Sequence, residues 1–329
     1  MRFLLCTLFV PLVRGQALLA QPVDGRNKPS GKKAPVESPD LARYALFENT
    51  APRPEATSPI DTQLPLKVEP SMSIALIGNT LLERSQDFGY LETLIQQAYP
   101  AHQLTVRNLA WSADSLHYPP RPANFADTDQ HLVFVKADII FAAYGFNESF
   151  AGPDGLGEFK AKLTEFVQAA KAKGFNGKRG PQLVLLSPIA SENITGVDAA
   201  KNNKNIRLYT RSMSEVAKAQ QVGFINVFDA TFKAMRPTGI DLTFNGCHLN
   251  DAGYRLFGRL VFDAAFDKPA PVVNEEIRAA VLEKNKQFFR RFRPVNTFYY
   301  TGGRNRSYGY LDFLPAMRNF DIMTANRDQ

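Results

Sequence analysis

The sequence predicts an α/β fold with a five-stranded parallel sheet, the three-layer, flavodoxin-like arrangement. From Ser73 onward, short β-rich runs alternate with segments of helical periodicity, which is typical of βαβ units. The chain has 329 residues, of which 44% are hydrophobic and 11% aromatic, so it can bury the core of such a domain. Polar residues follow several of the β-rich runs, and functional groups gather at the carboxyl ends of parallel strands.

We expect four segments in chain order. They are a signal peptide at residues 1–20, a Pro-rich arm or linker at 21–72, the α/β domain at 73–270 and a helical, aromatic extension at 271–329.

The N-terminus has the features of a secretory signal. Arg2 precedes an apolar run over residues 3–13 that is too short to span a bilayer, and cleavage is compatible with Gly15 or with Ala20. Cys6 lies inside the apolar run, which argues against a lipoprotein anchor. We therefore expect a secreted or periplasmic protein, and no other segment is a candidate membrane span.

Charge and cysteine content exclude some classes of protein. Removing the signal takes Arg2 and Arg14 and no acidic residue, so the formal net charge falls from +7 to +5. Lys and Arg are spread along the chain until its C-terminal part, which gives no basic patch for nucleic acid. Cys247 is the only cysteine left after cleavage, so no intramolecular disulfide can form.

The arm contains nine of the 22 prolines, between residues 22 and 70, and this composition resists regular structure. Two short pieces depart from it. We expect the apolar patch at 41–48 to dock on the domain, and residues 62–68 to add an edge strand to the sheet.

Five strands are expected in the domain, at residues 73–77, 104–109, 138–144, 183–186 and 223–228. Helices fill the gaps between them. The clearest places Phe159, Leu163, Phe166, Val167 and Ala170 on one face and ends before a glycine.

The extension begins with a helix for which Asn274 is a suitable N-cap. An aromatic and basic tail follows, which can stack on sugars, bind a partner or pack over the domain; its residues are Phe298, Tyr299, Tyr300, Arg304, Arg306, Tyr308 and Tyr310. The last residues carry no stop signal, so the sequence leaves open whether the chain normally continues.

Four polar motifs follow the predicted strands in order. They are "GNTLLER" at 78–84, "NLAWSAD" at 108–114, "YGFNES" at 144–149 and "TFNGCHLNDAGY" at 243–254. Together they resemble the four sequence blocks of the SGNH (GDSL-type) hydrolase superfamily over residues 73–266. Each motif is weak by itself, but four in order after predicted strands are fairly specific.

The resemblance implies roles for five positions. In the superfamily, a serine attacks an ester carbonyl, a histidine oriented by an aspartate acts as base, and two backbone N–H groups and an asparagine side chain bind the oxyanion. By position, Thr80 replaces the nucleophilic serine, Ala113 the oxyanion glycine and Asn245 the aspartate. Asn147 and His248 match the family's asparagine and histidine.

The three departures weaken the expected chemistry. The methyl group of Thr80 crowds the path of attack and restricts χ1. Ala113 costs little unless the backbone there needs a positive φ. Asn245 can orient an imidazole but cannot stabilise imidazolium, and the equivalent change in a serine protease lowers kcat by about 10⁴.

Each site residue also has a structural interpretation. Thr80 is well suited to cap the helix that begins there, Asn147 can hydrogen-bond a turn, and His248 can be a helix-capping or partly buried residue. Ser112 and Ser149 are alternative hydroxyl groups at strand ends. The remaining accessory candidates are Asn79, Arg84, Asp114 and Glu148.

Charge and position suggest roles for some of these. Arg84 lies one helical turn beyond Thr80 and can bind an anionic substrate or pair with a carboxylate. Asp114 and Glu148 can bind a cation or act with His248, although solvated loop carboxylates are much commoner. We expect Cys247 to face the core, since neighbours in an extended segment point to opposite sides.

The motifs also resemble one secreted branch of SGNH-like proteins that is found beside c-type haem-binding modules, so such a module is a candidate partner. This chain has no CxxCH motif and no closely spaced set of metal ligands, so we expect no cofactor of its own. Two functions follow. One is a secreted ester hydrolase, including one that removes acetyl groups from polysaccharides, and the other is a degenerate domain that binds a glycan or a protein.

Overall fold

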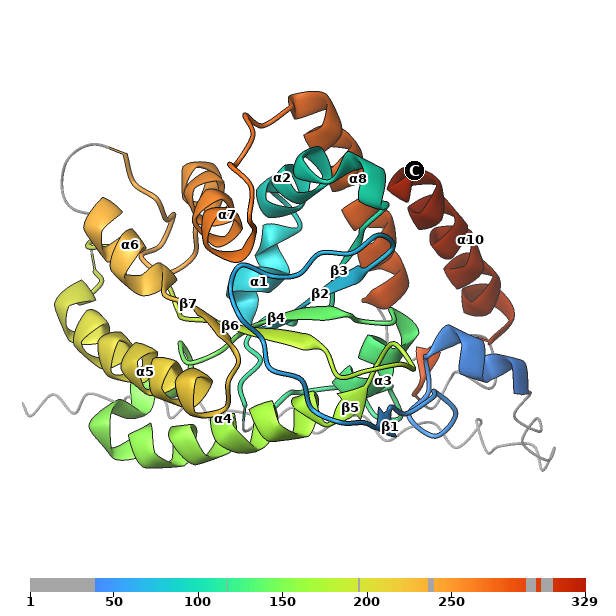
Figure 1. Ribbon diagram of the computed structural model, residues 1–329, viewed down its shortest axis with the longest axis horizontal. Helices are drawn as coiled ribbons and strands as arrows, with labels where there is room; N and C mark the ends of the chain where they lie inside the picture. The colour runs from blue at the N-terminus through green and yellow to red at the C-terminus, as the bar shows by residue number, and fades with distance from the viewer. Residues whose placement is uncertain (1–38, 117, 195, 236–239, 294–299, 303–309) are drawn as a thin grey trace, which may run out of the picture. The chain divides into compact units, whose positions relative to one another are not determined.

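The computed structural model describes residues 39–116, 118–194, 196–235, 240–293, 300–302 and 310–329. The expected signal peptide and the first part of the arm lie outside these residues. At the centre is a sheet with the order β3-β2-β4-β6-β7, in which all neighbours are parallel (Figure 1). The strands are β2 (Ser73–Gly78), β3 (Thr105–Asn108), β4 (Ile139–Ala143), β6 (Gln182–Leu186) and β7 (Gly223–Ile225).

This arrangement confirms the predicted α/β fold with a five-stranded parallel sheet. The last strand is shorter than predicted, because α6 (Val227–Ala234) begins where the strand was expected to continue. Asn226 caps that helix by accepting a hydrogen bond from the Asp229 N–H at 3.1 Å, which ends the extended backbone.

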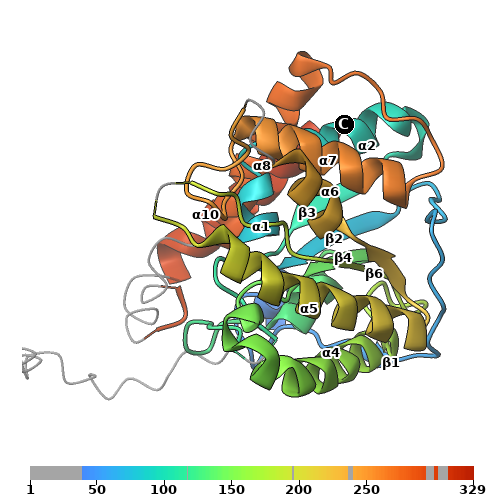
Figure 2. The same cartoon turned by 90° about the vertical axis from the view of Figure 1, so that its left-hand side faces the viewer.

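Helices cover both faces of the sheet (Figures 1 and 2). Apolar side chains of α1 (Thr80–Ser85), α2 (Tyr90–Ala98) and α7 (Asp251–Ala265) pack with Ile74 and Leu76 on one face. Those of α3 (Thr128–Phe134), α4 (Leu156–Lys171) and α5 (Ala199–Ala219) pack with Ala75 and Ile77 on the other. Successive side chains of β2 therefore point alternately into two hydrophobic cores, one on each face of the sheet, as expected for a sheet that is buried on both faces.

Part of the arm packs as expected and part does not. A short 3₁₀ helix, η2 (Pro39–Tyr44), leads into Tyr44 and Leu46, which are buried with Phe125 and Met317. The predicted edge strand at 62–68 is wrong, because its backbone N–H groups bond to scattered partners: Leu66 to the Ala265 carbonyl and Lys67 to the Gln182 side chain. The arm instead contributes β1 (Glu55–Ala56), which pairs antiparallel with β5 (Lys173–Gly174).

The C-terminal extension lies against the β3 edge of the sheet. Its first helix, α8 (Glu275–Phe292), is capped by Asn274 as predicted. Buried Lys284 donates to the Val106 carbonyl of β3 at 2.9 Å and pairs with Glu92 of α2 at 2.6 Å. A helix over the edge strand protects its free backbone groups from pairing with another chain.

The last helix, α10 (Tyr310–Asp328), packs on α8 (Figure 1), where Arg291 pairs with Asp321 at 2.9 Å. Of the predicted aromatic tail, Tyr300 is buried and stacks on Phe313. Tyr310 is the first residue of α10, and the other tail residues, Phe298, Tyr299, Arg304, Arg306 and Tyr308, lie outside the described residues. No helix among the described residues is long and apolar enough to cross a membrane.

Candidate active site

The first motif forms the turn between β2 and α1. Gly78 has φ +113°, and a Cβ there would lie 2.1 Å from the Ala143 carbonyl oxygen of β4, so the close approach of the two strand ends needs glycine. Asn79 is the N-cap, and its side chain accepts from the Leu81 N–H at 3.1 Å. The predicted capping role of Thr80 is therefore wrong: Thr80 is the first helical residue, and its hydroxyl group is left for other contacts.

The second motif meets the first at that hydroxyl group. The Ala113 N–H donates a hydrogen bond to Thr80 Oγ1 over 3.0 Å. Ala113 has φ +63°, the left-handed conformation that favours glycine. The backbone at the family's glycine position thus keeps the glycine-like conformation, and its N–H points at the candidate nucleophile, where an oxyanion donor is needed.

The third motif places Asn147 beside the second. Its Nδ2 donates to the carbonyl oxygens of Ala113, at 3.1 Å, and Asp114, at 2.9 Å. The side chain is thus next to the predicted oxyanion site. Its two amide hydrogens are, however, used to hold the backbone of residues 113–114.

The fourth motif forms a tight turn at residues 243–249, which we call the His248 turn. The Phe244 N–H donates to the His248 carbonyl at 3.1 Å, and Thr243 and Leu249 form an antiparallel bridge. Asn245 Oδ1 accepts from the His248 backbone N–H at 2.9 Å. Asn245 and His248 are thus brought together as the resemblance predicted.

The contact between the two side chains bears on the histidine's protonation. His248 Nδ1 lies 2.8 Å from Asn245 Nδ2 and 3.1 Å from Asn245 Oδ1. Donation from Nδ2 to Nδ1 places the imidazole proton on Nε2, whereas a general base needs a free Nε2. Burial, and then the positive charge of Arg84, lower the pKa of His248, so its neutral form is favoured.

Cys247 does not face the core, contrary to prediction. Its Sγ lies 3.4 Å from His248 Nδ1, because the segment is a turn with Gly246 at φ +86° and not an extended strand. Burial raises the pKa of the Cys247 thiol, which keeps it protonated and weakly nucleophilic.

Two further side chains surround the histidine. The Phe244 ring stacks on the His248 ring at 5.7 Å between centroids, and the Arg84 guanidinium lies 5.0 Å from the Phe244 centroid. The Nε of Arg84 is buried without a hydrogen bond. Burial raises the pKa of Asp87, and the charge of Arg84 opposes this. Arg84 therefore places a positive charge beside the candidate base, shared with Asp87.

The alternative hydroxyl groups differ in access. Ser149 is 3% exposed and donates to the Phe146 carbonyl at 2.7 Å, so it is a structural residue. Ser112 is exposed and donates to Glu83 Oε2 at 3.0 Å. Ser112 thus remains accessible at the edge of the site.

Asp114 and Glu148 are buried, which corrects the expectation of solvated loop carboxylates. Asp114 forms two 2.7 Å hydrogen bonds with Arg121; burial raises the pKa of Asp114 and Arg121 opposes this. Glu148 accepts from the N–H groups of Leu116 and Gly145, both at 2.8 Å, and so joins the loops after β3 and β4. The described residues contain no cluster of three His, Cys, Asp or Glu side chains that could hold a metal ion.

One functional candidate was missed from the sequence. Glu192, after β6, is 5% exposed and accepts hydrogen bonds from Leu242 and Thr243 at the start of the His248 turn. It belongs to no motif. The sequence feature that could have identified Glu192 is its position as a lone carboxylate in a largely apolar segment after a predicted strand.

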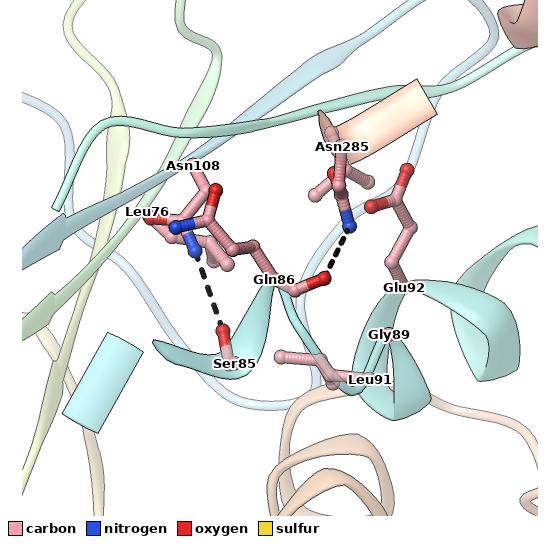
Figure 3. A pocket seen from close by; sticks show the side chains of 9 residues that line it. Leu76, Ser85, Gln86, Gly89, Leu91, Glu92, Asn108 and Asn285 are labelled. Carbon is pink, nitrogen blue, oxygen red and sulfur yellow. Dashed lines mark hydrogen bonds between the residues drawn. The ribbon is translucent and has the colours of Figure 1, made fainter. Parts of the chain in front are cut away.

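A small cavity is lined by residues of α1, α2, α8 and the strands β2 and β3, and by none of the candidate site residues above. Figure 3 shows Asn108 directed at Ser85 and Asn285 directed at the Gln86 backbone, with Glu92 nearby. Its volume of about 20 Å³ suits a single water molecule. The cavity is therefore a packing feature and not a substrate site.

Comparison with known proteins agrees with the geometry. The model of the GDSL-like lipase/acylhydrolase family matches residues 81–256, slightly more than half of the chain. The chain therefore belongs to this family. The matched span contains Ala113, Asn147, Asn245 and His248 and begins one residue after Thr80.

Two of the similar solved structures are the following. A catalytic mutant of Axe2, an acetylxylan esterase from Geobacillus stearothermophilus, has 18% identity and a TM-score of 0.47, with 59% of this chain and 94% of that chain covered. An alpha/beta hydrolase from the metagenome of Lake Arreo, Spain, has 16% identity and a TM-score of 0.44, with 58% and 94% covered. No curated protein matches the chain.

Proposed function

We propose that this protein is a slow carboxylic ester hydrolase in which Thr80 is the nucleophile and His248 the base. The observation that carries the proposal is the 3.0 Å hydrogen bond from the Ala113 N–H to Thr80 Oγ1. It brings a hydroxyl group and a backbone donor to the position where the family requires a nucleophile and an oxyanion donor.

In the proposed reaction, Thr80 Oγ1 attacks the acyl carbon and its proton passes to His248 Nε2. On this attack the carbonyl oxygen becomes an oxyanion, which takes over the hydrogen bond from the Ala113 N–H. The tetrahedral intermediate then collapses: the oxyanion re-forms the carbonyl and the C–O bond to the leaving alcohol breaks. The alcohol leaves with the proton, and a water molecule activated by His248 then releases the acyl group from Thr80. His248 must carry its proton on Nδ1 before the attack, a tautomer that Asn245 supports only through Oδ1.

The finer part of the proposal is the substrate, an acetylated carbohydrate outside the cytoplasm. Three large exposed aromatic side chains lie in segments that follow strands or carry the base: Tyr118 after β3, Phe150 in the 3₁₀ helix after β4 (Glu148–Gly155), and Phe244 in the His248 turn. Aromatic faces stack on the apolar faces of sugar rings. The positive charge of Arg84, which after burial also lowers the pKa of His248, favours sugars that carry a negative charge, such as uronic acids.

A second function is favoured by one specific observation. The Ala113 N–H and both Asn147 amide hydrogens have acceptors within the protein. A domain that keeps the shape of the site but binds a glycan without hydrolysing it would need no free oxyanion donor. The two functions differ in whether any acyl group is released.

Acetate release from acetylated xylan, acetylated pectin and p-nitrophenyl acetate tests the proposal. We expect the mature protein to release acetate, and Thr80→Ala and His248→Ala to reduce release to the level without enzyme. Ser112→Ala is the matched control for an exposed hydroxyl group nearby and should keep its activity. Binding of these glycans without release, by all variants alike, would favour the second function.

A further inference from the structure

Glu192 connects the loop after β6 to the turn that carries the candidate base. Its Oε2 accepts from the Thr243 N–H at 2.7 Å and from Thr243 Oγ1 at 2.6 Å. Its Oε1 accepts from the Leu242 N–H at 2.9 Å. A buried carboxylate with several donors is strongly held, because each bond forms away from competing water.

The contacts continue into the His248 turn. Thr243 Oγ1 accepts from the Gly246 N–H at 2.9 Å, and the Glu192 backbone N–H donates to the Gly246 carbonyl at 2.8 Å. Gly246 is also enclosed, since a Cβ there would lie 2.9 Å from Val197 Cγ2. Glu192 thus holds Leu242 and Thr243 through its side chain, and Gly246 through its backbone and through Thr243.

The other half of the site has a comparable support in Glu148. That carboxylate accepts from the N–H groups of Leu116 and Gly145, which belong to the loops bearing Ala113 and Asn147. Glu148 contacts the oxyanion side of the site, whereas Glu192 contacts the side of the base. The two glutamates have the same chemistry and different targets, which makes each a control for the other.

We propose that Glu192 is a positioning residue that fixes the orientation of His248 through Thr243 and Gly246. The proposal rests on the proposed function for its effect on catalysis. Its structural part concerns the environment of His248 and can be tested without any substrate. Glu192 does not touch the reacting atoms, so its effect must pass through the turn.

The experiment compares Glu192→Gln with Glu148→Gln. A glutamine at 192 keeps one oxygen and turns an NH₂ group toward a backbone N–H donor, so the turn must shift. The His248 ring is followed by NMR through a pH titration, and kcat and KM are measured with p-nitrophenyl acetate. Thr243→Val is a milder second variant that removes only the hydroxyl group, in case Glu192→Gln fails to fold.

We expect Glu192→Gln to raise the pKa of His248 toward its ordinary value, because the ring gains contact with water. We expect kcat to fall roughly 10- to 100-fold with little change in KM, the size expected for a displacement of about 1 Å. Thr243→Val should show a smaller change in the same direction. Glu148→Gln should lower kcat but leave the His248 titration unchanged.

An unchanged His248 titration in both Glu192→Gln and Thr243→Val would overturn the proposal. An equal change in Glu148→Gln would also overturn it, because it would indicate general loosening. If the wild-type protein releases no acetate, the proposed ester hydrolysis fails while the titration still decides the role of Glu192.

Discussion

Two of the four histidines, His131 and His248, lie in very different surroundings, and their comparison shows what makes a candidate base. His131, in α3, is 3% exposed, and its ring packs against Phe125 and Phe292 at centroid distances of 5.2 and 4.8 Å. Its Nδ1 donates to the Asp127 carbonyl at 2.8 Å, which fixes the proton on that nitrogen. Burial lowers the pKa of His131 to about 3.

His248 shares the neutral state but not the enclosure. It is half-buried, its Nδ1 faces the amide of Asn245, and no described residue hydrogen-bonds its Nε2. Both rings are neutral because they have lost water, and neither has a carboxylate partner. A neutral imidazole is therefore not evidence of catalysis; the free second nitrogen and the group that faces the first one distinguish His248.

The largest effect is expected from giving His248 the carboxylate that it lacks. In Asn245→Asp, a carboxylate accepts from Nδ1, selects the tautomer with a free Nε2 and stabilises imidazolium. The esterase kcat should rise by up to about 10⁴, the size of the reverse change in a serine protease. Steady-state kinetics measures this rise.

Asn245→Ala is the control for that variant, since it removes the amide without adding a charge and should give no rise. Equal activities of Asn245→Asp and wild type would show that the neutral amide does not limit the reaction.

The next effect concerns His131 and the pH dependence of stability. Its folded-state pKa of about 3 lies below the ordinary value of 6.5, so the unfolded chain binds the proton first. The contribution of neutral His131 to the free energy of unfolding is complete above pH 6.5. It declines by about 1.4 kcal/mol per pH unit as the pH falls toward 3. Urea unfolding between pH 7 and 5 measures this slope.

His131→Gln should flatten that slope, whereas His248→Gln should barely change it because His248 is only half-buried. The interpretation of His131 as an enclosed structural residue is wrong if the two variants change the slope equally.

A smaller effect is expected at the nucleophile. Thr80→Ser removes the methyl group that restricts χ1 and crowds the attacking oxygen. If this restriction adds about 0.5–1.5 kcal/mol to the activation free energy, its removal in Thr80→Ser raises kcat roughly 2- to 10-fold. Kinetics with p-nitrophenyl acetate tests this, and a fall in kcat would show that the methyl group positions the hydroxyl.

The smallest effect is expected at Ala113. Its φ of +63° strains an alanine, and Ala113→Gly removes the strain but adds freedom to the unfolded chain. The free energy of unfolding should rise by no more than about 1 kcal/mol. Urea denaturation at neutral pH measures it, and a loss of stability would mean that the Ala113 methyl group packs usefully.

The sequence was a good guide to the sheet and to which residues meet at the site. Alternation and turn residues predicted the strands because those patterns are local, and the motifs predicted that Asn245 lies beside His248. The failures concern side-chain environment, which depends on the tertiary fold. Asp114 and Glu148 were expected in solvent, but Arg121 and the N–H groups of two loops allow their burial.

Other failures have the same origin. Cys247 was placed in the core by assuming an extended segment, and Glu192 has no motif because its partners lie about 50 residues away in the chain. Such contacts cannot be derived from spacing alone.

The central claim is that Thr80 carries the acyl group during hydrolysis. The most direct measurement is mass spectrometry of the protein quenched with acid during turnover of p-nitrophenyl acetate, followed by fragmentation of the peptide that contains residue 80. The account predicts an acetyl group on Thr80 that is absent in Thr80→Ala and in His248→Ala. An acetyl group on Ser112 instead, or acetate release with no acylated residue, would contradict it.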